Sequence, residues 1–535
     1  DLLTLENGNR SYVDAAVEVG ALYEYKVAKQ LNYPGAFDQK HVAYGYLLGG
    51  IKAPLVENRG GLALVVERSL LEPLAQEITQ LENDLIGDGW RVYRVEVERD
   101  AGVSEVKSRL RALYETDRPG LRAVFLLGRV PVPYSGNFQP SPPDGHSGLG
   151  DDHRGAWPAD VYYADMDGEW TDRTERYVNE TNVRGTNLPE DGKFDPSYLP
   201  SDVELQIGRV DLSSLPGTGA KRAWPDEIAL LKAYLDRDHA FRHGALKVPR
   251  RALIGDSYDA NGGRAYPASA YRSLMPVLGP GNLDVASTEL AAPIEERWVS
   301  RFTGKSYLWS FGSGGGSNTA VNGLGLRPPY NTLTSTDIVD LEVNAVFQLF
   351  FGSWFGDWDQ PDNLMRTALT TKYGLASAWS GRPHLVFHAM GMGETLGFCI
   401  RASQNNQDSY SNQINTFRRG VHVALIGDPT LRMYPVPAPT EVVASARAGA
   451  VVLSWKPSPD VLGHHVYRAA NSGAAFVRLT EVPEVGNEFT DPGREADGSV
   501  YMVRAITLET TPSGSFYNAS QGVFAKPAPA VAEEQ

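Results

Sequence analysis

The segment between residues 62 and 127 alternates apolar runs with amphipathic runs, and this alternation limits the possible folds more than any other feature of the chain. Residues 62–66, 91–95 and 123–127 are short runs rich in Val and Leu, which is typical of strands. Between them, apolar side chains recur at steps of three and four residues and predict a helix over 71–86 (Leu71, Leu74, Ile78, Leu81, Leu85). A second helix is predicted over 103–114. Strand–helix–strand repeats predict a largely parallel sheet with right-handed crossovers.

A second series of the same kind follows further along the chain. Strands are predicted at 205–208, 251–255, 283–285, 307–310 and 345–351, with helices at 225–241, 267–278 and from Asn363 onward. The sequence therefore predicts one large α/β unit, built as one sheet or as two sheets side by side. We divide it into a first half over 58–245 and a second half over 246–436.

The two ends of the chain show a period of two instead. Residues 451–455, 465–468 and 500–505 are short alternating segments separated by turn residues, which predicts a β-sandwich. Residues 437–526 resemble a fibronectin type III domain, on Leu453-Ser454-Trp455, Tyr467-Arg468 and the strand after Tyr501. Residues 1–57 resemble the last strands of a second, incomplete domain of that type. The Ala-, Pro- and Glu-rich end, 527–535, is expected to be disordered.

Composition narrows the class of protein. The net charge of −15 argues against nucleic acid and anionic membranes as partners, because both bind basic surfaces. No apolar run is long enough to span a membrane. Cys399 is the one cysteine, so no disulfide framework or thiolate metal site is possible, and its apolar neighbours predict a buried, inert thiol.

Two glycine-containing loops follow predicted strands, over 311–316 and 352–357. In an open parallel sheet, functional groups lie in loops beyond the carboxyl ends of the strands. A phosphate-binding role for the first loop is disfavoured, because it lacks the Lys-Ser/Thr ending and a GxGxxG pattern in register with a helix. We expect no nucleotide, haem or flavin.

The paired loops resemble the catalytic region of gingipain-type cysteine peptidases, within the caspase-like group. In order along the chain, the match rests on residues 162–168, residues 205–209, Phe311-Gly312-Ser313, the second loop from Ser353 to Asp357, and residues 425–432. The resemblance covers about 58–436. It implies a caspase-like α/β fold, and a dyad in which an imidazole deprotonates a thiol and backbone N–H groups of the loop, here at Gly312 and Ser313, receive the oxyanion.

At both dyad positions this sequence departs from the family. Phe311 stands where the resemblance places His, and Ser353 where it places Cys. Phenylalanine cannot act as a base, and a serine hydroxyl without a base stays protonated. The sequence predicts a pseudo-peptidase. The alternative is that His384 or His388 supplies the missing base to Ser353. Both histidines lie in a predicted strand and are separated by an even number of residues, so they share one face of it.

Several acidic groups are candidate ligands or turns. Asp165, Asp167, Glu169 and Asp172 offer hard oxygen ligands around a Gly turn, a pattern suited to Ca²⁺, with Asp160, Asp191 and Asp195 as further contributors. The alternative is an acidic solvated loop with Asx turns.

For three other acidic segments, the sequence favours a loop, a turn or a cleft-lining position over a ligand site. The His- and Asp-containing segment 144–153 matches no known ligand spacing and is expected to be a flexible loop. A turn with a helix N-cap is expected from Asp357, Asp359 and Asp362. Asp256 and Asp259 follow a strand and are expected to line the same cleft as the loops.

Five aromatic residues cluster near the loops, and they either bind a peptide, glycan or partner loop or fill the space left by a lost dyad (Trp309, Phe311, Trp354, Phe355, Trp358). Filling is the favoured reading. We expect a bacterial protein at the cell surface or outside the cell, exported by a signal that lies outside this chain, with a protein or glycan partner and a structural or binding role. An active hydrolase using Ser353 or an unidentified base is the alternative.

Overall fold

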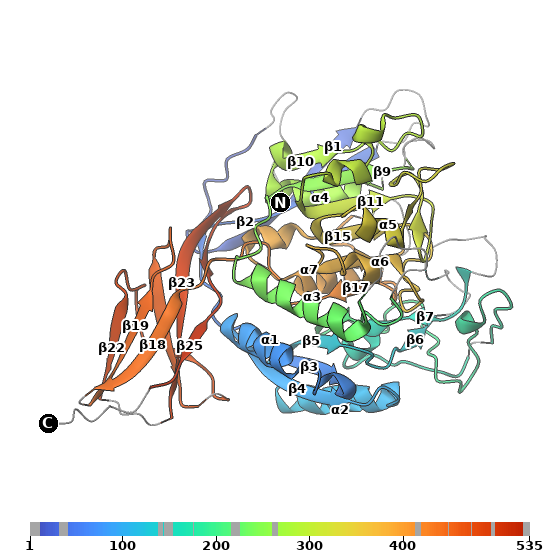
Figure 1. Ribbon diagram of the computed structural model, residues 1–535. Coiled ribbons are helices and arrows are strands. Elements are labelled where there is room, and N and C mark those ends of the chain that lie inside the picture. The colour runs from blue at the N-terminus through green and yellow to red at the C-terminus, as the bar shows by residue number, and fades with distance from the viewer. Residues whose placement is uncertain are drawn as a thin grey trace.

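The computed structural model describes residues 11–31, 41–136, 143, 153–174, 176–215, 225–258, 266–411, 419–447, 449–471, 473–493 and 498–527. Its largest element is one continuous ten-stranded sheet (Figure 1). In spatial order its strands are β10 (Leu283–Val285), β9 (Ala252–Asp256), β11 (Tyr307–Ser313), β15 (Ala345–Phe351), β16 (Ala376–Trp379), β17 (Ala424–Gly427), β8 (Gln206–Val210), β5 (Leu121–Leu127), β3 (Gly60–Glu67) and β4 (Trp90–Val97).

The predicted parallel sheet is confirmed, with one exception. Every neighbouring pair in it runs parallel except β16 and β17, which are antiparallel. The parallel pairing of β17 with β8 joins the two halves of the α/β unit. The boundary at 245/246 therefore divides one sheet and not two sheets side by side.

The helices cover both faces of this sheet, as apolar strands require. Alternate residues of β3 enter different cores: Leu62 and Leu64 pack into the larger core, and Ala63 and Val65 into the smaller one that also holds Val106 of α2. The helices are α1 (Ala75–Gly87), α2 (Val103–Thr116), α3 (Glu227–Arg242), α4 (Ala268–Leu278), α5 (Ser335–Asp340), α6 (Leu364–Ala368) and α7 (Leu396–Gln404).

The C-terminal segment forms an all-β module (Figure 1). One sheet contains β18 (Thr440–Arg447), β19 (Ala450–Lys456) and β22 (Glu488–Pro492). The other contains β20 (Gly463–Ala469), β21 (Val477–Arg478), β23 (Val500–Thr511), β24 (Gly514–Ala519) and β25 (Val523–Ala525). Side chains from both sheets, among them Val451, Trp455, Val466 and Tyr501, share a small core. The predicted sandwich pattern at 451–455, 465–468 and 500–505 is therefore seen.

The N-terminal strands belong to this same module. β1 (Leu22–Leu31) and β2 (His41–Ala53) pair with each other, and β2 pairs in parallel with β24. They extend the sheet of the C-terminal module, in the order β1-β2-β24-β23-β20-β21, instead of forming a sheet of their own. The expected remnant of a separate first domain is thus an edge of the second module, brought there by a long-range pairing that no local pattern encodes.

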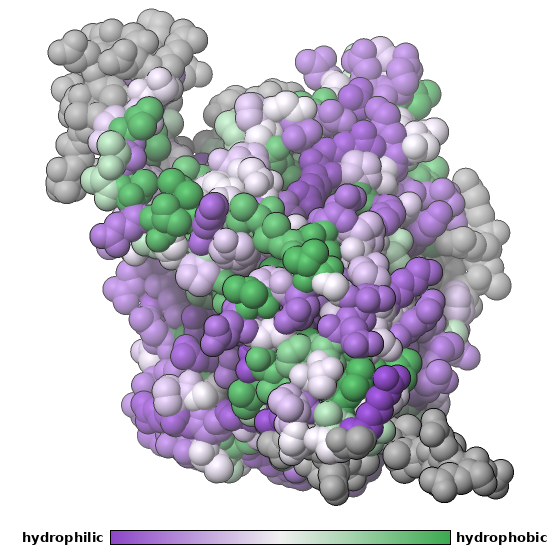
Figure 2. Space-filling model, turned by 90° about the vertical axis from the view of Figure 1, so that its left-hand side faces the viewer, coloured by the Kyte–Doolittle hydropathy of each residue, from purple (hydrophilic) through white to green (hydrophobic). Residues whose placement is uncertain are grey.

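Apolar side chains of the module's outer surface lie in separate patches. Figure 2 views the molecule from the module's side and shows hydrophobic patches interrupted by hydrophilic side chains. Exposed residues of the module include Val443, Leu462, Val477, Val482 and Val485. The remaining small elements are the sheet β12 (Gly316–Ser317), β13 (Ala320–Val321) and β14 (Leu333–Thr334), and the pair β6 (Tyr134–Ser135) and β7 (Trp157–Pro158).

Candidate functional site

The two strands that carry the dyad-equivalent loops are neighbours. β11 and β15 pair in parallel, with Phe311 opposite Leu349 and Ser313 opposite Phe351. Their carboxyl ends therefore meet at one edge of the sheet, as predicted. Phe311 is only 2% exposed and belongs to the main apolar core. Its carbonyl oxygen accepts a hydrogen bond of 3.0 Å from Nε1 of Trp298. Position 311 thus supplies a packed benzene ring and no proton acceptor from its side chain.

The polar groups beside Phe311 are already engaged with each other. Ser313 donates its hydroxyl hydrogen to Oδ1 of Asp256, at 2.5 Å, and both residues are buried at the tips of adjacent strands. The backbone N–H of Ser257 donates to the carbonyl of Ser313 at 2.9 Å. Asp256 therefore lies at the same edge as the loops, as expected from its place after a strand; Asp259 lies outside the described residues.

Gly312 is required by close packing on its face of the sheet. A Cβ atom there would lie 2.5 Å from Cδ1 of Leu324, closer than real Cβ atoms approach other heavy atoms. This constraint explains the glycine without any role in binding an oxyanion. The oxyanion assignment to Gly312 and Ser313 stays a prediction.

Ser353 begins a loop that is held by aromatic side chains. Ser353 is partly exposed, and Trp354 has a φ of +71°, a left-handed conformation that is uncommon for a bulky residue. The Trp354 ring stacks on Trp157, with centroids 5.3 Å apart, and Trp157 in turn stacks on Trp379 at 6.2 Å. Nε1 of Trp379 donates to the carbonyl of Gly352 at 3.0 Å. The strained turn is therefore fixed from two sides.

An imidazole also lies beside this loop. The ring of His153 has its centroid 4.3 Å from that of Trp354, next to Ser353 in the sequence. Sequence reasoning missed His153, because it placed this residue at the end of a flexible loop; residues 144–152 lie outside the described residues. Trp157, Trp379 and His422, whose ring lies 6.4 Å from that of Trp157, were also missed. Only the fold brings these distant positions together.

The two predicted rescue histidines are placed elsewhere. Nδ1 of His384 lies 2.7 Å from the carbonyl oxygen of Arg382, and burial lowers the pKa of His384 to about 4. Nε2 of His388 lies 2.6 Å from a carboxylate oxygen of Glu24 on β1. Neither imidazole hydrogen-bonds to Ser353 in the part of the chain that the structure describes. Both imidazoles have other partners, and rescue by His384 or His388 stays a prediction.

The strand predicted around these histidines is absent too. Residues 380–387 form no strand, and His388 begins a 3-10 helix, His388–Met392. The segment connects β16 to α7 and does not pair with any strand in the described residues. Its even spacing therefore does not indicate a shared face.

The acidic residues after Ser353 form an ion-pair cluster. Arg184 contacts Asp357, with Nη1 to Oδ1 at 3.3 Å, and also bonds to Asp359, which accepts a hydrogen bond from Tyr134. Burial raises the pKa of Asp357 to about 6. The expected N-cap is Asn363, which accepts hydrogen bonds from the backbone of α6, and not Asp362. Through these ion pairs, the cluster connects the loop after Ser353 to the segment that contains Arg184.

The predicted calcium turn is only partly brought together. Asp165 and Asp167 lie with Glu204, their ligand oxygens within 4.8 Å of one another, whereas Glu169 is not among them. Asp172 instead accepts hydrogen bonds from the backbone N–H groups of Glu190 and Gly192, at 2.8 and 2.9 Å. Glu204, 37 residues away from Asp167, was missed.

Hydrogen-bond donors already surround Asp165. Its carboxylate accepts from the N–H of Gly168, from Nε1 of Trp170 and from the hydroxyl of Ser201. The Lys107 ammonium donates to the carbonyls of Tyr162 and Asp165, and burial lowers its pKa to about 8. These contacts stabilise the turn by themselves, and calcium binding here stays a prediction.

A second group of side chains that could bind a metal ion consists of one carboxylate and two imidazoles, and no sequence motif predicts it. His239 of α3 and His243, the residue that caps the C-terminus of α3, face Asp84 of α1, at 2.7 and 2.8 Å from its two carboxylate oxygens. The hydrogen bond to Asp84 raises the pKa of His239. The spacing of two histidines by four residues on a helix was the only available sign.

Two further predictions concern burial. Cys399 is buried, and burial raises the pKa of its thiol well above the ordinary value, so the thiol is inert as predicted. Of the five aromatic residues near the loops, four are buried and Trp354 is partly exposed (Trp309, Phe311, Phe355, Trp358). Their burial agrees with a filling role.

The comparisons with known proteins come from structure alone, since no protein-family model and no curated protein matches the chain. The Arg-specific cysteine proteinase gingipain R (RgpB) is 14% identical and matches 88% of this chain with 99% of its own, at a TM-score of 0.48. The complex of Porphyromonas gingivalis RgpB pro- and mature domains gives 13% identity, 88% and 100% coverage, and the same TM-score.

A smaller match involves one end of the chain. An Fn3-like protein from Clostridium thermocellum is 17% identical and covers 18% of this chain and 99% of its own, at a TM-score of 0.15. At such identities and TM-scores, none of these likenesses carries a conclusion about chemistry. None of the helices in the described ranges is long and apolar enough to cross a membrane.

Proposed function

We propose that this protein is a non-catalytic homologue of gingipain-type cysteine peptidases that acts as a structural or binding subunit. One observation carries the proposal: Phe311, two residues before the end of β11 and paired with the strand that precedes Ser353, has a buried benzene ring as its side chain. A hydroxyl becomes a useful nucleophile only when an adjacent base takes its proton. The ring at 311 cannot do this.

The placement of described imidazoles outside the Ser353 loop supports the proposal. His384 contacts a backbone carbonyl, His388 contacts Glu24, and the pair of His239 and His243 contacts Asp84. His422, near Trp157, has Nδ1 3.2 Å from the carbonyl oxygen of Pro158. His464 and His465 lie on β20 of the C-terminal module. Each of these rings is committed to a local partner or belongs to another part of the molecule.

One observation favours a different function, a hydrolase that uses Ser353. His153 stacks on Trp354, the residue that follows Ser353. An imidazole in contact with the residue after Ser353 is a candidate base. We retain this as the second candidate.

The binding role rests on the partly exposed Trp354 and on the apolar patches of the C-terminal module (Figure 2). Tryptophan is enriched among the residues that contribute most of the binding energy of protein interfaces, and exposed apolar patches can mark interaction sites. We propose a protein or glycan partner and a location at the bacterial surface or outside the cell.

Incubation with a broad peptide library, with and without Ca²⁺, separates the two functions. We expect no cleavage above that of the Ser353→Ala variant, because the hydroxyl lacks a base at position 311. Cleavage that disappears in both Ser353→Ala and His153→Ala, while Ser317→Ala retains it, would establish the hydrolase instead.

A further inference from the structure

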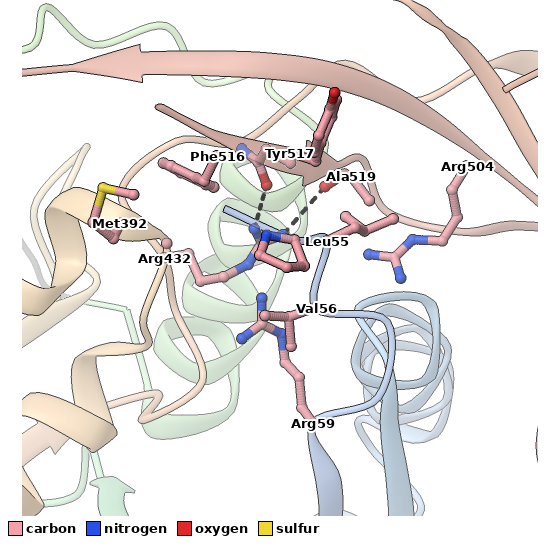
Figure 3. A pocket seen from close by; sticks show the side chains of 12 residues that line it. Leu55, Val56, Arg59, Met392, Arg432, Arg504, Phe516, Tyr517 and Ala519 are labelled. Carbon is pink, nitrogen blue, oxygen red and sulfur yellow. Dashed lines mark hydrogen bonds between the residues drawn. The ribbon is translucent and has the colours of Figure 1, made fainter. Parts of the chain in front are cut away.

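A small cavity lies where the linker before β3, the α/β domain and the C-terminal module meet. Figure 3 shows the side chains that line it, with three arginines directed toward one another around Val56. Arg59 comes from the linker, Arg432 from the segment after β17, and Arg504 from β23 of the all-β module. The cavity has about 20 Å³ of room for the centre of a water-sized sphere, which suits about one water or one monatomic ion.

The three arginines share one carboxylate. Nη2 of Arg432 lies 2.6 Å from Oδ1 of Asp88, Nε of Arg59 lies 3.6 Å from Oδ2, and Nη2 of Arg504 lies 3.8 Å from Oδ1. The four side chains are 10%, 7%, 1% and 1% exposed for Arg432, Arg59, Arg504 and Asp88. Three positive charges therefore face one negative charge in a nearly dry site.

The imbalance persists after neighbouring groups are considered. Glu394 is the other carboxylate that acts on Arg59, and it forms no ion pair within the described residues. Burial lowers the pKa of Arg59 to about 10, which leaves it protonated at neutral pH. Glu57 also acts on Arg504 but is ion-paired with Arg478, and Arg242, which acts on Asp88, is ion-paired with Asp238 and Asp428. Within 4 Å, the three arginines of this group therefore share Asp88 alone among the described carboxylates. Burying a charge is costly unless it is paired.

Two donors in this group also lack acceptors. Nε of Arg59 and Nη1 of Arg504 are buried and have no hydrogen-bond partner among the described residues. Arg432 differs, because it also donates to Asn518 and to the carbonyl of Ala519 on β24 (Figure 3). Buried polar atoms without partners are rare in folded proteins and point to an unseen acceptor.

We propose that this cavity binds one halide-sized anion, chloride, between the guanidinium groups of Arg59, Arg432 and Arg504. A water molecule could accept the hydrogen bonds but would leave the charge uncompensated. The room for one water-sized sphere favours a monatomic anion over phosphate, sulfate or a carboxylate ligand. A monatomic anion satisfies both the donors and the charge.

The anion would stabilise the junction of the two domains. It binds groups from the linker, from the α/β domain and from the all-β module at once, so it is bound only when the three segments are docked. A ligand that binds only the folded state raises its stability in proportion to the logarithm of its concentration.

Crystals soaked in bromide, together with thermal unfolding, test the proposal. We expect an anomalous bromide peak among the three guanidinium groups. We also expect the unfolding temperature to rise by about 2 °C between 0 and ~0.2 M chloride at constant ionic strength, with gluconate, which is too large for the cavity, as the replacement anion.

Two variants of the full chain separate this site from general salt effects. Arg59→Met keeps the apolar stem and should abolish the chloride dependence. The matched control is Arg250→Met at the same junction, where the arginine is half exposed and paired with Glu509, and it should leave the dependence unchanged. Absence of the bromide peak, or equal unfolding temperatures of the wild type in chloride and gluconate, overturns the proposal whether or not Arg59→Met folds.

Discussion

The edge of the sheet at β11 and β15 and the junction around Asp88 differ in which buried polar groups lack hydrogen-bond partners among the described residues: neutral indole N–H groups of Trp157 and Trp309 near the edge, and charged guanidinium groups at the junction. In the region that resembles a catalytic centre, Ser313 and Asp256 are hydrogen-bonded to each other, and the carbonyl of Phe311 is bonded by Trp298. At the junction, charged N–H groups of Arg59 and Arg504 are buried and have no acceptor among the described residues.

The junction should be the more sensitive of the two regions to loss of one charge. Asp88→Asn removes the one carboxylate among the described residues that lies within 4 Å of the three arginines, and the loss of one partner of a buried ion pair is expected to cost about 3–5 kcal/mol. The free energy of unfolding from urea denaturation measures this. Asp100→Asn, at an exposed position, is the control and should change it by less than ~0.5 kcal/mol. A loss below ~1 kcal/mol for Asp88→Asn would show that the junction charges are solvated.

Acid should weaken the fold through His384. Its pKa is about 4 in the folded chain because of burial and about 6.5 in an unfolded chain, so the unfolded state takes up the proton first as the pH falls. The stability conferred by the neutral ring is present above pH ~6.5, is lost progressively toward pH ~4, and amounts to about 2–3 kcal/mol between pH ~6.5 and ~4.5.

Urea denaturation at both pH values checks the sign and the size. His384→Gln, which does not titrate, should reduce the difference between the two free energies by that amount. An unchanged difference in this variant would place the acid sensitivity in other groups.

A histidine placed at position 311 should harm the fold. Phe311→His exchanges a packed ring for a polar one in the main core, at an expected cost of about 2–3 kcal/mol. Phe311→Leu, which stays apolar, is the control and should cost less. If Phe311→His were as stable as the wild type, position 311 would face solvent and the comparison between the two regions would fail.

The hydrogen bond at the sheet edge should have the smallest effect. Ser313→Ala removes the donor to Asp256 and is expected to cost about 1–2 kcal/mol, because a buried carboxylate oxygen loses its partner. Ser317→Ala in the partly exposed β12 is the comparison. If Ser313→Ala left the free energy of unfolding unchanged, water would reach Asp256 at this edge of the sheet.

Local patterns predicted the sheet and its helices well, since the alternation over 62–127 depends on neighbours in the sequence. The same patterns placed Phe311 and Ser353 at adjacent strand ends. They failed where distant segments meet. The pairing of β2 with β24, the approach of His153 to Trp354 and the three arginines around Asp88 each join residues far apart in the chain.

The reactivity of the Ser353 hydroxyl tests the central claim most directly. The full chain is treated with a fluorophosphonate, which forms a bond only with an activated serine, and its intact mass is measured against a serine hydrolase treated in parallel. We predict an unchanged mass, because the side chain at position 311 is a buried benzene ring and not a base. A mass increase located at Ser353 and abolished by His153→Ala would contradict the account and identify a working nucleophile.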